Sequence, residues 1–287
     1  MKRRTLIIGG TGTIGQSLIG LMQKGGEDFV VLARSESKAK PLRDAGLEVI
    51  IGELGNWPTI EKHLDGIDTI FLLTNPAPEQ VALQNGLIDL AEVKSVRKIV
   101  KISALGAKVS SPIHLADWHG RIEEYLKASS LDYVILQPHS FMQNMLMSLP
   151  MIKQQSAFYQ SLGDSKIPLV DTRDIAKASY QAIVTDDYNN STYVITGGEP
   201  VSYDDMANAL SKATGKNIKY IRIPVDAHRI GMKEAGVPSW LADDLANMNA
   251  ALQKSAKHEA SGDFELLTQA RQVTIDDFAQ DYADIFR

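Results

Sequence analysis

The chain has 287 residues, of which 44% are hydrophobic and 23% are charged, and its formal net charge is −5. These values are ordinary for a globular protein with a large core, and the acidic balance argues against a general nucleic-acid binder, which needs a basic face. The absence of cysteine excludes disulfides, thiolate metal sites and thiol nucleophiles.

Apolar runs in the chain are short. The run after the basic N-terminal residues, Thr5–Ile8, is shorter than the about 7–15 apolar residues of a signal-peptide core. No later run approaches the ~18 apolar residues of a membrane span. We therefore expect a cytoplasmic protein that neither enters nor crosses a membrane.

The first half of the chain alternates short β-branched runs with helical patterns. Strands are predicted at Leu6–Ile8, Phe29–Ala33, Glu48–Ile51, Thr69–Leu73, Ile99–Ser103 and Tyr133–Gln137. Helices are predicted at Ile14–Lys24, Ser37–Ala45, Trp57–Leu64, Glu79–Val93 and Asp117–Ser129. Strands that are apolar almost throughout and alternate with helices are typical of a parallel sheet covered on both faces. The pattern predicts an α/β fold with a doubly wound parallel sheet.

The pattern loosens after Pro138. Helices are predicted at Thr172–Val184, Ser202–Thr214, Ser239–Ser255 and Thr274–Phe286, and a strand at Thr192–Thr196. The first of these helices has Asp171 or Thr172 as its N-cap, and the second begins with Ser-x-x-Asp and ends at Gly215. We expect a first domain at residues 1–148 and a smaller, mostly helical lobe at 149–287, interleaved with the first around 166–200.

A run of glycines follows the first predicted strand. In "GGTGTIG" they occupy Gly9, Gly10, Gly12 and Gly15, between a strand and an amphipathic helix. Small residues here let the chain turn sharply, let the backbone approach a pyrophosphate, and let the helix pack closely on the strand. The N-terminus of the helix offers free N–H groups to the phosphates. The motif predicts a Rossmann-type dinucleotide site.

The end of the second predicted strand indicates which dinucleotide binds. An NAD-binding protein usually has Asp or Glu there, to hold the ribose 2′-hydroxyl. This chain reads "VVLARSESK" and has Arg34, with Lys38 close by and Glu36 as the opposing charge. A guanidinium can pair with a 2′-phosphate and stack on adenine. We therefore expect NADP(H) in preference to NAD(H); the alternative is a solvated surface arginine.

These residues, with several later ones, resemble the atypical short-chain dehydrogenase/reductases, and among them the NmrA-like group. The matching segments are "GGTGTIG", "VVLARS", "VIIGELGN", "DTIFLLTNP", "KIVKISALGA", "HGRIEEYLKASSLDYVILQPHSFMQN" and "VDTRDIAKA". The resemblance implies a Rossmann fold, an NADP-preferring site and a small C-terminal lobe that closes over the nicotinamide. Members include quinone and dye reductases, relatives of isoflavone reductases, and regulators that sense cofactor redox state without turnover.

The resemblance also implies a set of cofactor-binding positions. They comprise the phosphate turn, the 2′-phosphate contacts, a position near the adenine, and the ends of the fourth, fifth and sixth strands. In this chain they are Gly9, Thr11, Gly12, Thr13, Ile14, Gly15, Arg34, Lys38, Glu53, Thr74, Asn75, Pro76, Ser103, Pro138, Ser140 and Phe141.

The chain lacks one feature of typical short-chain dehydrogenases. Their Tyr-x-x-x-Lys motif supplies a proton to a nascent alkoxide, and no tyrosine here has a lysine four residues later. Substrates that accept hydride without a strong acid therefore remain: quinones, enones, cationic dyes and iminium ions. Ser103 and His119 are the candidates for assisting the proton balance. His119 and Glu123, at i and i+4, are alternatively a local pair on the helix surface.

Residues after the sixth predicted strand are candidates for substrate contact. In an open parallel sheet, ligands bind at the carboxyl ends of the strands. The candidates are His139, Phe141, Met142 and Met145. A loop histidine bonded to backbone and methionines packed in the core are the alternatives. No motif for a metal site is present.

The sequence thus predicts an NADPH-dependent oxidoreductase that transfers hydride to a conjugated small molecule such as a quinone, enone, dye or iminium ion. Two alternatives stay open: a non-catalytic NADP(H) sensor of NmrA type, which would bind a partner protein, and an enzyme like the nucleotide-sugar epimerases. Either a monomer or a homodimer is expected, with no nucleic-acid partner.

Overall fold

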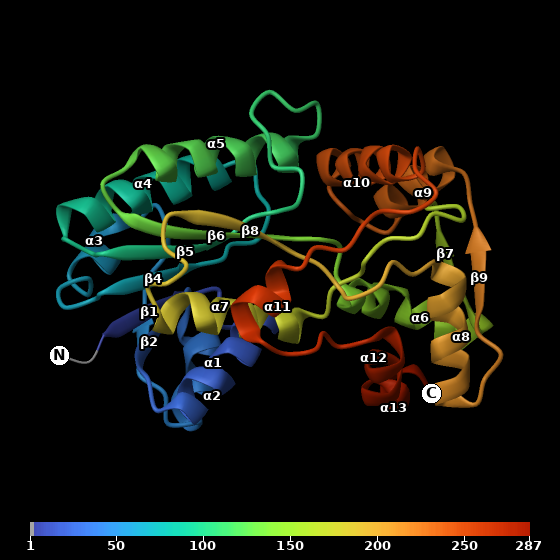
Figure 1. The fold of residues 1–287 in the computed structure, drawn as a ribbon, viewed down its shortest axis with the longest axis horizontal. Helices are drawn as coiled ribbons and strands as arrows, with labels where there is room; N and C mark the ends of the chain where they lie inside the picture. Colours follow the sequence, from blue (N-terminus) through green and yellow to red (C-terminus); the bar gives the residue numbers. More distant parts are fainter. Residues whose placement is uncertain (1–2) are drawn as a thin grey trace.

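A parallel sheet forms the centre of the first lobe in the computed structural model, which describes residues 3–287 (Figure 1). Within that range its seven strands are β1 (Arg4–Ile8), β2 (Asp28–Ala33), β3 (Val49–Ile51), β4 (Thr69–Leu72), β5 (Lys98–Ile102), β6 (Asp132–Pro138) and β8 (Ser191–Ile195). Their spatial order is β3-β2-β1-β4-β5-β6-β8, and every neighbouring pair is parallel. The order reverses between β1 and β4, which is the switch point where such sheets bind ligands.

Helices cover both faces of this sheet. One face carries α1 (Thr13–Gly25), α2 (Glu36–Asp44), α7 (Thr172–Val184) and α11 (Asp263–Thr268); the other carries α3 (Trp57–Glu61), α4 (Gln80–Val93) and α5 (His114–Ala128) (Figure 1). Successive residues of β1 show why both faces need cover. Ile7 packs with α1 and α7, whereas Leu6 and Ile8 pack with α3, α4 and α5. The predicted Rossmann-type α/β fold is confirmed.

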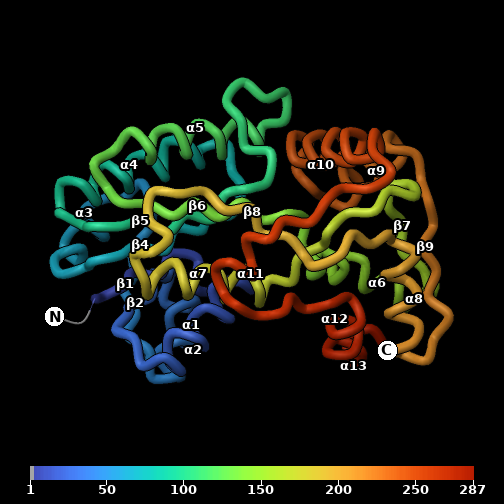
Figure 2. Tube along the Cα trace, in the orientation of Figure 1, coloured from blue at the N-terminus to red at the C-terminus, as the bar shows by residue number. Residues whose placement is uncertain are grey.

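The second lobe has a hydrophobic core of its own. Its elements are η1 (Met142–Ser148), α6 (Leu149–Gln155), β7 (Ala157–Gln160), α8 (Tyr203–Thr214), β9 (Lys219–Arg222), α9 (Val225–Glu234), α10 (Ser239–Leu252), α12 (Ile275–Asp281) and α13 (Ala283–Phe286). Phe158, Leu210 and Phe278 are fully buried in this core. The chain crosses between the lobes several times, and the C-terminus lies beside α8 (Figure 2).

Local signals in the second half are largely confirmed. The helix at Thr172–Val184 has the predicted bounds, and its N-cap Asp171 accepts a hydrogen bond from the N–H of Arg173. Ser202 forms the predicted capping box, and Gly215 ends that helix with a φ of 75°. The single helix predicted at Thr274–Phe286 is wrong, because the chain breaks at Tyr282 into α12 and α13.

Contacts between segments far apart in the sequence form the features of this lobe that the hydrophobic pattern did not predict. β7 and β9 pair in parallel across about sixty residues of chain, from Ala157 opposite Lys219 to Gln160 opposite Arg222. Phe264 and Leu267 of α11 return to the core of the first lobe after α10 has ended. The division of the chain at residue 148 stays a prediction. Residues 1 and 2 of the predicted first domain lie outside the range that the structure describes.

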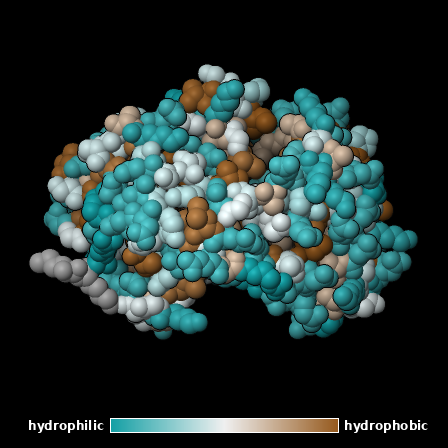
Figure 3. Space-filling view, in the orientation of Figure 1, coloured by the Kyte–Doolittle hydropathy of each residue, from teal (hydrophilic) through white to brown (hydrophobic). Residues whose placement is uncertain are grey.

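Polar side chains predominate on the face of the molecule seen in Figure 3, with hydrophobic ones scattered among them. The outline is indented between the two lobes (Figure 3). Among residues 3–287, no helix combines the length and the hydrophobicity that crossing a bilayer requires.

A buried lysine ties the sheet to the end of α7. Lys98 is fully buried, and its Nζ donates to the carbonyl oxygens of Ala182 at 2.8 Å and Thr185 at 2.7 Å and lies 3.3 Å from Oδ1 of Asp186. We expect Lys98→Met to lower the free energy of unfolding by about 1–3 kcal/mol, because it leaves buried carbonyl groups without donors. Urea unfolding checks this, and an unchanged midpoint would contradict it.

Candidate cofactor and active site

Three glycines of the first turn are required by the fold itself. Gly9 has a φ of 87°, and a Cβ there would lie 2.6 Å from the carbonyl oxygen of Leu73. At Gly10 it would lie 2.5 Å from a methyl of Val31, and at Gly15 it would lie 2.2 Å from the carbonyl oxygen of Gly9. The contact at Gly15 is the close packing of helix on strand that the motif predicts.

Gly12 is different, because no neighbouring atom requires a glycine. Its φ is −86°, and an added Cβ would meet only the carbonyl oxygen of Gly9, at an ordinary 3.5 Å. The N–H groups of Thr13, Ile14 and Gly15, in the first turn of α1, have no acceptor within residues 3–287. An open cradle of free N–H groups at a helix N-terminus fits a pyrophosphate.

Arg34 follows β2 directly and is exposed. Its guanidinium makes no hydrogen bond or ion pair with any of residues 3–287, and neither does the Nζ of Lys38. The opposing charge, Glu36, is held by Arg43 at 2.6 Å. Glu53 is exposed just beyond β3, the strand next to β2. A free cation just after β2 and a second in the first turn of α2 fit a 2′-phosphate.

The predicted residues after β4 lie on the loop that leads to α4. The hydroxyl of Thr74 accepts a hydrogen bond of 2.8 Å from Nε2 of Gln84, a buried residue of α4. Asn75 and Pro76 are exposed on the same loop. Thr74 therefore anchors the loop at the carboxyl edge of the sheet.

Ser103 directly follows β5 and lies against α5. Its hydroxyl donates to Oε1 of Glu123 at 2.5 Å, and both side chains are buried. The same carboxylate accepts a hydrogen bond of 2.8 Å from Nε2 of Gln137. The Ser103 proton is thus already donated inside the protein, which makes Ser103 a supporting group more than a free acid.

His119 lies one turn before Glu123 on α5 and is partly exposed. Its Nδ1 lies 2.9 Å from Nζ of Lys101, a fully buried residue of β5, and its Nε2 lies 3.5 Å from the side-chain amide of Gln80. Burial, and then the charge of Lys101, hold the pKa of His119 well below its usual value. The ring is therefore neutral, and its contacts are interior, unlike those of a surface pair.

The neighbours of His119 place it at the junction of the lobes. Trp118 contacts Trp240 of α10, with ring centroids 4.9 Å apart, and Nδ1 of His114 lies 3.0 Å from Oδ1 of Asp244. The start of α5 approaches α10 in Figure 1.

The residues after β6 form the crossing into the second lobe. Pro138 and His139 are buried, and Phe141 pairs with Val170 in a single β-bridge. Nδ1 of His139 accepts a hydrogen bond of 2.7 Å from the N–H of Ser140. Burial, with a smaller contribution from His258, lowers the pKa of His139 to about 4. The ring is neutral at pH 7, and its proton is on Nε2.

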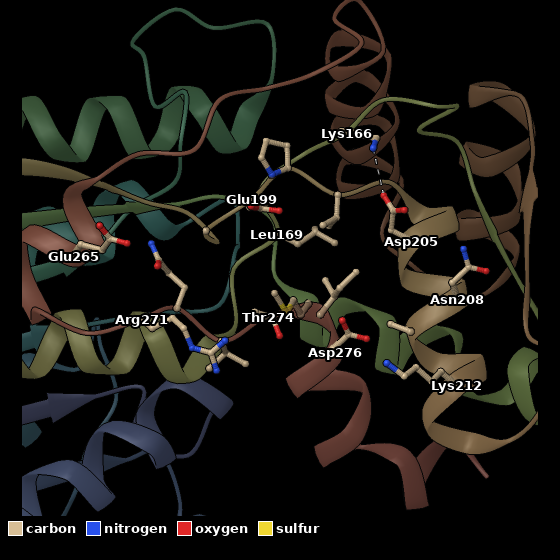
Figure 4. Close-up of a pocket in the computed structure, with 18 residues that line it drawn as sticks. Lys166, Leu169, Glu199, Asp205, Asn208, Lys212, Glu265, Arg271, Thr274 and Asp276 are labelled. Carbon is tan, nitrogen blue, oxygen red and sulfur yellow. Dashed lines mark ion pairs between the residues drawn. The ribbon is translucent and has the colours of Figure 1, made fainter.

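The two methionines lie in the second lobe. Met142 and Met145 are each 2% exposed and belong to its core. Met142 also lines a cavity of about 790 Å³ between α8 and the segment that joins α11 to α12 (Figure 4). Its rim is charged, with Lys166 paired to Asp205, and Arg271 enters from the opposite side (Figure 4). No other residue predicted for cofactor or substrate contact lines the described walls of this cavity.

Two participants were not singled out from the sequence. Lys101 and Gln80 both contact His119, and both are buried. A signal was present, because "KIVKIS" places charged residues inside an otherwise apolar strand. Every residue of β5 is buried, so its lysines need internal partners.

The fold and the glycine turn define the class: a Rossmann-type protein with the phosphate-binding turn of dinucleotide-binding proteins. The model of the NmrA-like family matches residues 1–285. The chain belongs to the NmrA-like family.

Several of the similar proteins have the names of reductases or oxidoreductases. An NAD(P)H azoreductase of Xenophilus azovorans is 33% identical over 245 residues, which cover 85% of this chain and 86% of that protein. Quinone oxidoreductase 2 of Escherichia coli (strain K12) is 27% identical over 258 residues, covering 89% and 90%. The structure of an NADPH-dependent quinone oxidoreductase of Escherichia coli with NADPH superposes with a TM-score of 0.86 at 25% identity, covering 96% and 99%.

Proposed function

We propose that this protein is an NADPH-dependent reductase that transfers hydride to a conjugated small molecule, such as a quinone, enone, dye, azo compound or iminium ion. The observation that carries the proposal is the free cradle of N–H groups at Thr13–Gly15 on the same sheet edge as the unpaired Arg34. The names of the azoreductase and of the quinone oxidoreductases support the activity.

In this proposal the chain mainly binds and orients its ligands. The first turn of α1 holds the pyrophosphate, and Arg34 with Lys38 holds the 2′-phosphate. A bound reduced nicotinamide supplies the hydride. Pro138, Ser140 and Phe141 line the nicotinamide, and the segment from His139 to Met142 leads from there into the lobe that covers the acceptor. Catalysis is then largely proximity and exclusion of water, with the partly exposed His119 as the proton donor.

The proposal is tested in two stages. NADPH and NADH are first titrated against the protein, with nicotinamide fluorescence as the signal. Quinones, enones, azo dyes and triarylmethane dyes are then added while the absorbance of the reduced nicotinamide is followed. Turnover of any acceptor supports the reductase. Tight binding without turnover of any acceptor would overturn it in favour of a cofactor sensor, and binding of a nucleotide sugar would favour an epimerase-like enzyme.

Arg34→Ala tests the preference for NADPH. We expect the Kd for NADPH to rise by about 10–100-fold, because the variant loses charge-assisted hydrogen bonds to a phosphate, while the Kd for NADH changes little. Lys24→Ala is the matched control, because it removes one exposed positive charge at the far end of α1 and leaves Arg34 and the Arg43–Glu36 pair in place. An equal loss of affinity for both cofactors in the Arg34 variant would place the 2′-phosphate elsewhere.

A further inference from the structure

Lys101 is a charged residue whose role the proposed function leaves open. It belongs to β5, it is fully buried, and its Nζ has two acceptors: Nδ1 of His119 at 2.9 Å and the carbonyl oxygen of Ile102 at 3.2 Å. Ile102 is the last residue of β5, so the side chain extends toward the carboxyl edge of the sheet. The ammonium group thus lies on the Nδ1 side of the His119 ring, within hydrogen-bond distance.

These contacts determine which nitrogen of His119 carries the proton. While Lys101 is protonated, its ammonium group only donates, so Nδ1 of His119 is the acceptor and the ring proton lies on Nε2. Nε2 lies 3.5 Å from Nε2 of Gln80, which would set two donors against each other, while Oε1 of Gln80 is buried without a partner among the described residues. Exchanging the two ends of the Gln80 amide resolves both conflicts, because Oε1 then faces the Nε2 proton. At 3.5 Å this contact is at the limit of a hydrogen bond, so it holds the proton far less firmly than Glu123 holds the Ser103 proton at 2.5 Å.

We propose that Lys101 and His119 form a proton relay at the junction of the lobes, in which Lys101 is the proton source and His119 delivers the proton to the reduced substrate. The proposal rests on the proposed function for its substrate. His119 is the catalytic residue of the pair, since it is not fully buried and follows Trp118, whose ring contacts Trp240 across the lobe junction, and Lys101 is a positioning residue that acts through it.

For a neutral acceptor such as a quinone, enone or azo compound, the step balances as one hydride and one proton, whereas an iminium ion or a cationic dye takes the hydride alone and does not use the relay. With hydride supplied by reduced nicotinamide, the accepting molecule carries an added electron pair and becomes more basic. The N–H bond at Nε2 of His119 breaks as an O–H or N–H bond forms on that molecule. Nδ1 of His119 takes a proton from Nζ of Lys101 in the same event, so the ring stays neutral. Water in the cleft returns the proton along the same path after release.

The surroundings of Lys101 suit a group that gives up a proton near neutrality. Burial lowers the pKa of Lys101 to about 7, and the nearby Glu123 carboxylate partly opposes that shift. The other titratable group that faces it is His119, on the same helix as Glu123. From α4, the residue that contacts His119 is the neutral amide Gln80. The protonated form is the donor, so turnover should fall as pH rises through about 7.

The test replaces Lys101 by methionine, which keeps the length of the side chain and removes the amine. Turnover at pH 6.5 should fall on the order of 10²-fold, with the KM for the acceptor little changed, and its decline around pH 7 should disappear. Lys98→Met is the matched control, because Lys98 is a buried lysine of the same strand whose partners belong to α7. It should keep the wild-type pH profile.

A second readout needs neither cofactor nor substrate. In histidine labelled with ¹⁵N, wild-type His119 should show an unprotonated Nδ1 and a protonated Nε2, and its signals are assigned by their loss in His119→Gln. Lys101→Met should remove this tautomer preference. A protonated Nδ1 in the wild type, or an unchanged pH profile in the methionine variant, would overturn the relay. If no acceptor is turned over, the proposed function is overturned instead. The ¹⁵N spectrum would still show whether Nζ of Lys101 donates to Nδ1 of His119.

Discussion

Gly12→Ala will weaken NADPH binding by about 10–100-fold while the protein keeps its stability. The added methyl meets only the carbonyl oxygen of Gly9 at 3.5 Å, and the φ of −86° suits any residue. The folded state therefore accommodates alanine within about 0.5 kcal/mol. A pyrophosphate on the N–H groups of Thr13 to Gly15 would be displaced by that methyl, and each charge-assisted hydrogen bond lost costs about 1.5–3 kcal/mol. Isothermal titration with NADPH gives the affinity, and thermal unfolding gives the stability.

Two further glycines in α1 serve as controls for Gly12. Gly20→Ala makes the same change at an exposed position with open space around it, so binding should be unchanged and stability should rise by about 0.5–1 kcal/mol. Gly15→Ala should instead destabilise the fold by about 1–3 kcal/mol, since its methyl would overlap the carbonyl oxygen of Gly9. Wild-type NADPH affinity in Gly12→Ala would show that the pyrophosphate does not lie on this turn.

Acidification will cost the wild-type protein more stability than a variant without His139. The pKa of His139 is about 4 in the folded state, below the usual 6.5, because the ring is buried. Between these values the unfolded chain binds a proton that the folded protein does not. The contribution of neutral His139 is therefore complete above pH 6.5 and is lost as the pH falls toward 4. The difference in pKa corresponds to about 3 kcal/mol of the free energy of unfolding.

His139→Asn is the variant for this measurement, because the asparagine side-chain oxygen can accept the Ser140 N–H that Nδ1 now accepts. Urea unfolding of both proteins is followed from pH 7 to pH 4. The wild type should lose up to about 3 kcal/mol more than the variant, since the remaining titratable groups are common to both. Parallel losses would mean that His139 becomes protonated in the folded protein within this range.

Much of the candidate site could be predicted because it depends on local chemistry. The glycine turn, the basic residue at the end of β2 and the caps at Asp171 and Ser202 each act within a few residues of chain. The interior contacts of His119 could not be predicted in the same way. Its spacing from Glu123 suggested a local pair, whereas the structure pairs it with Lys101, eighteen positions earlier on a different element.

The sequence by itself determined the alternation of strands and helices, the phosphate-binding turn and the family. Each of these follows from a local pattern of residues: the hydrophobic period, the spacing of the glycines and the family motifs. The tertiary structure alone decided the strand order, the pairing of β7 with β9, the return of α11 to the first lobe and the burial of Lys101 behind His119. These features depend on which apolar faces pack against each other and on which polar groups become buried in contact with one another. That is settled only when segments far apart in the sequence pack against each other.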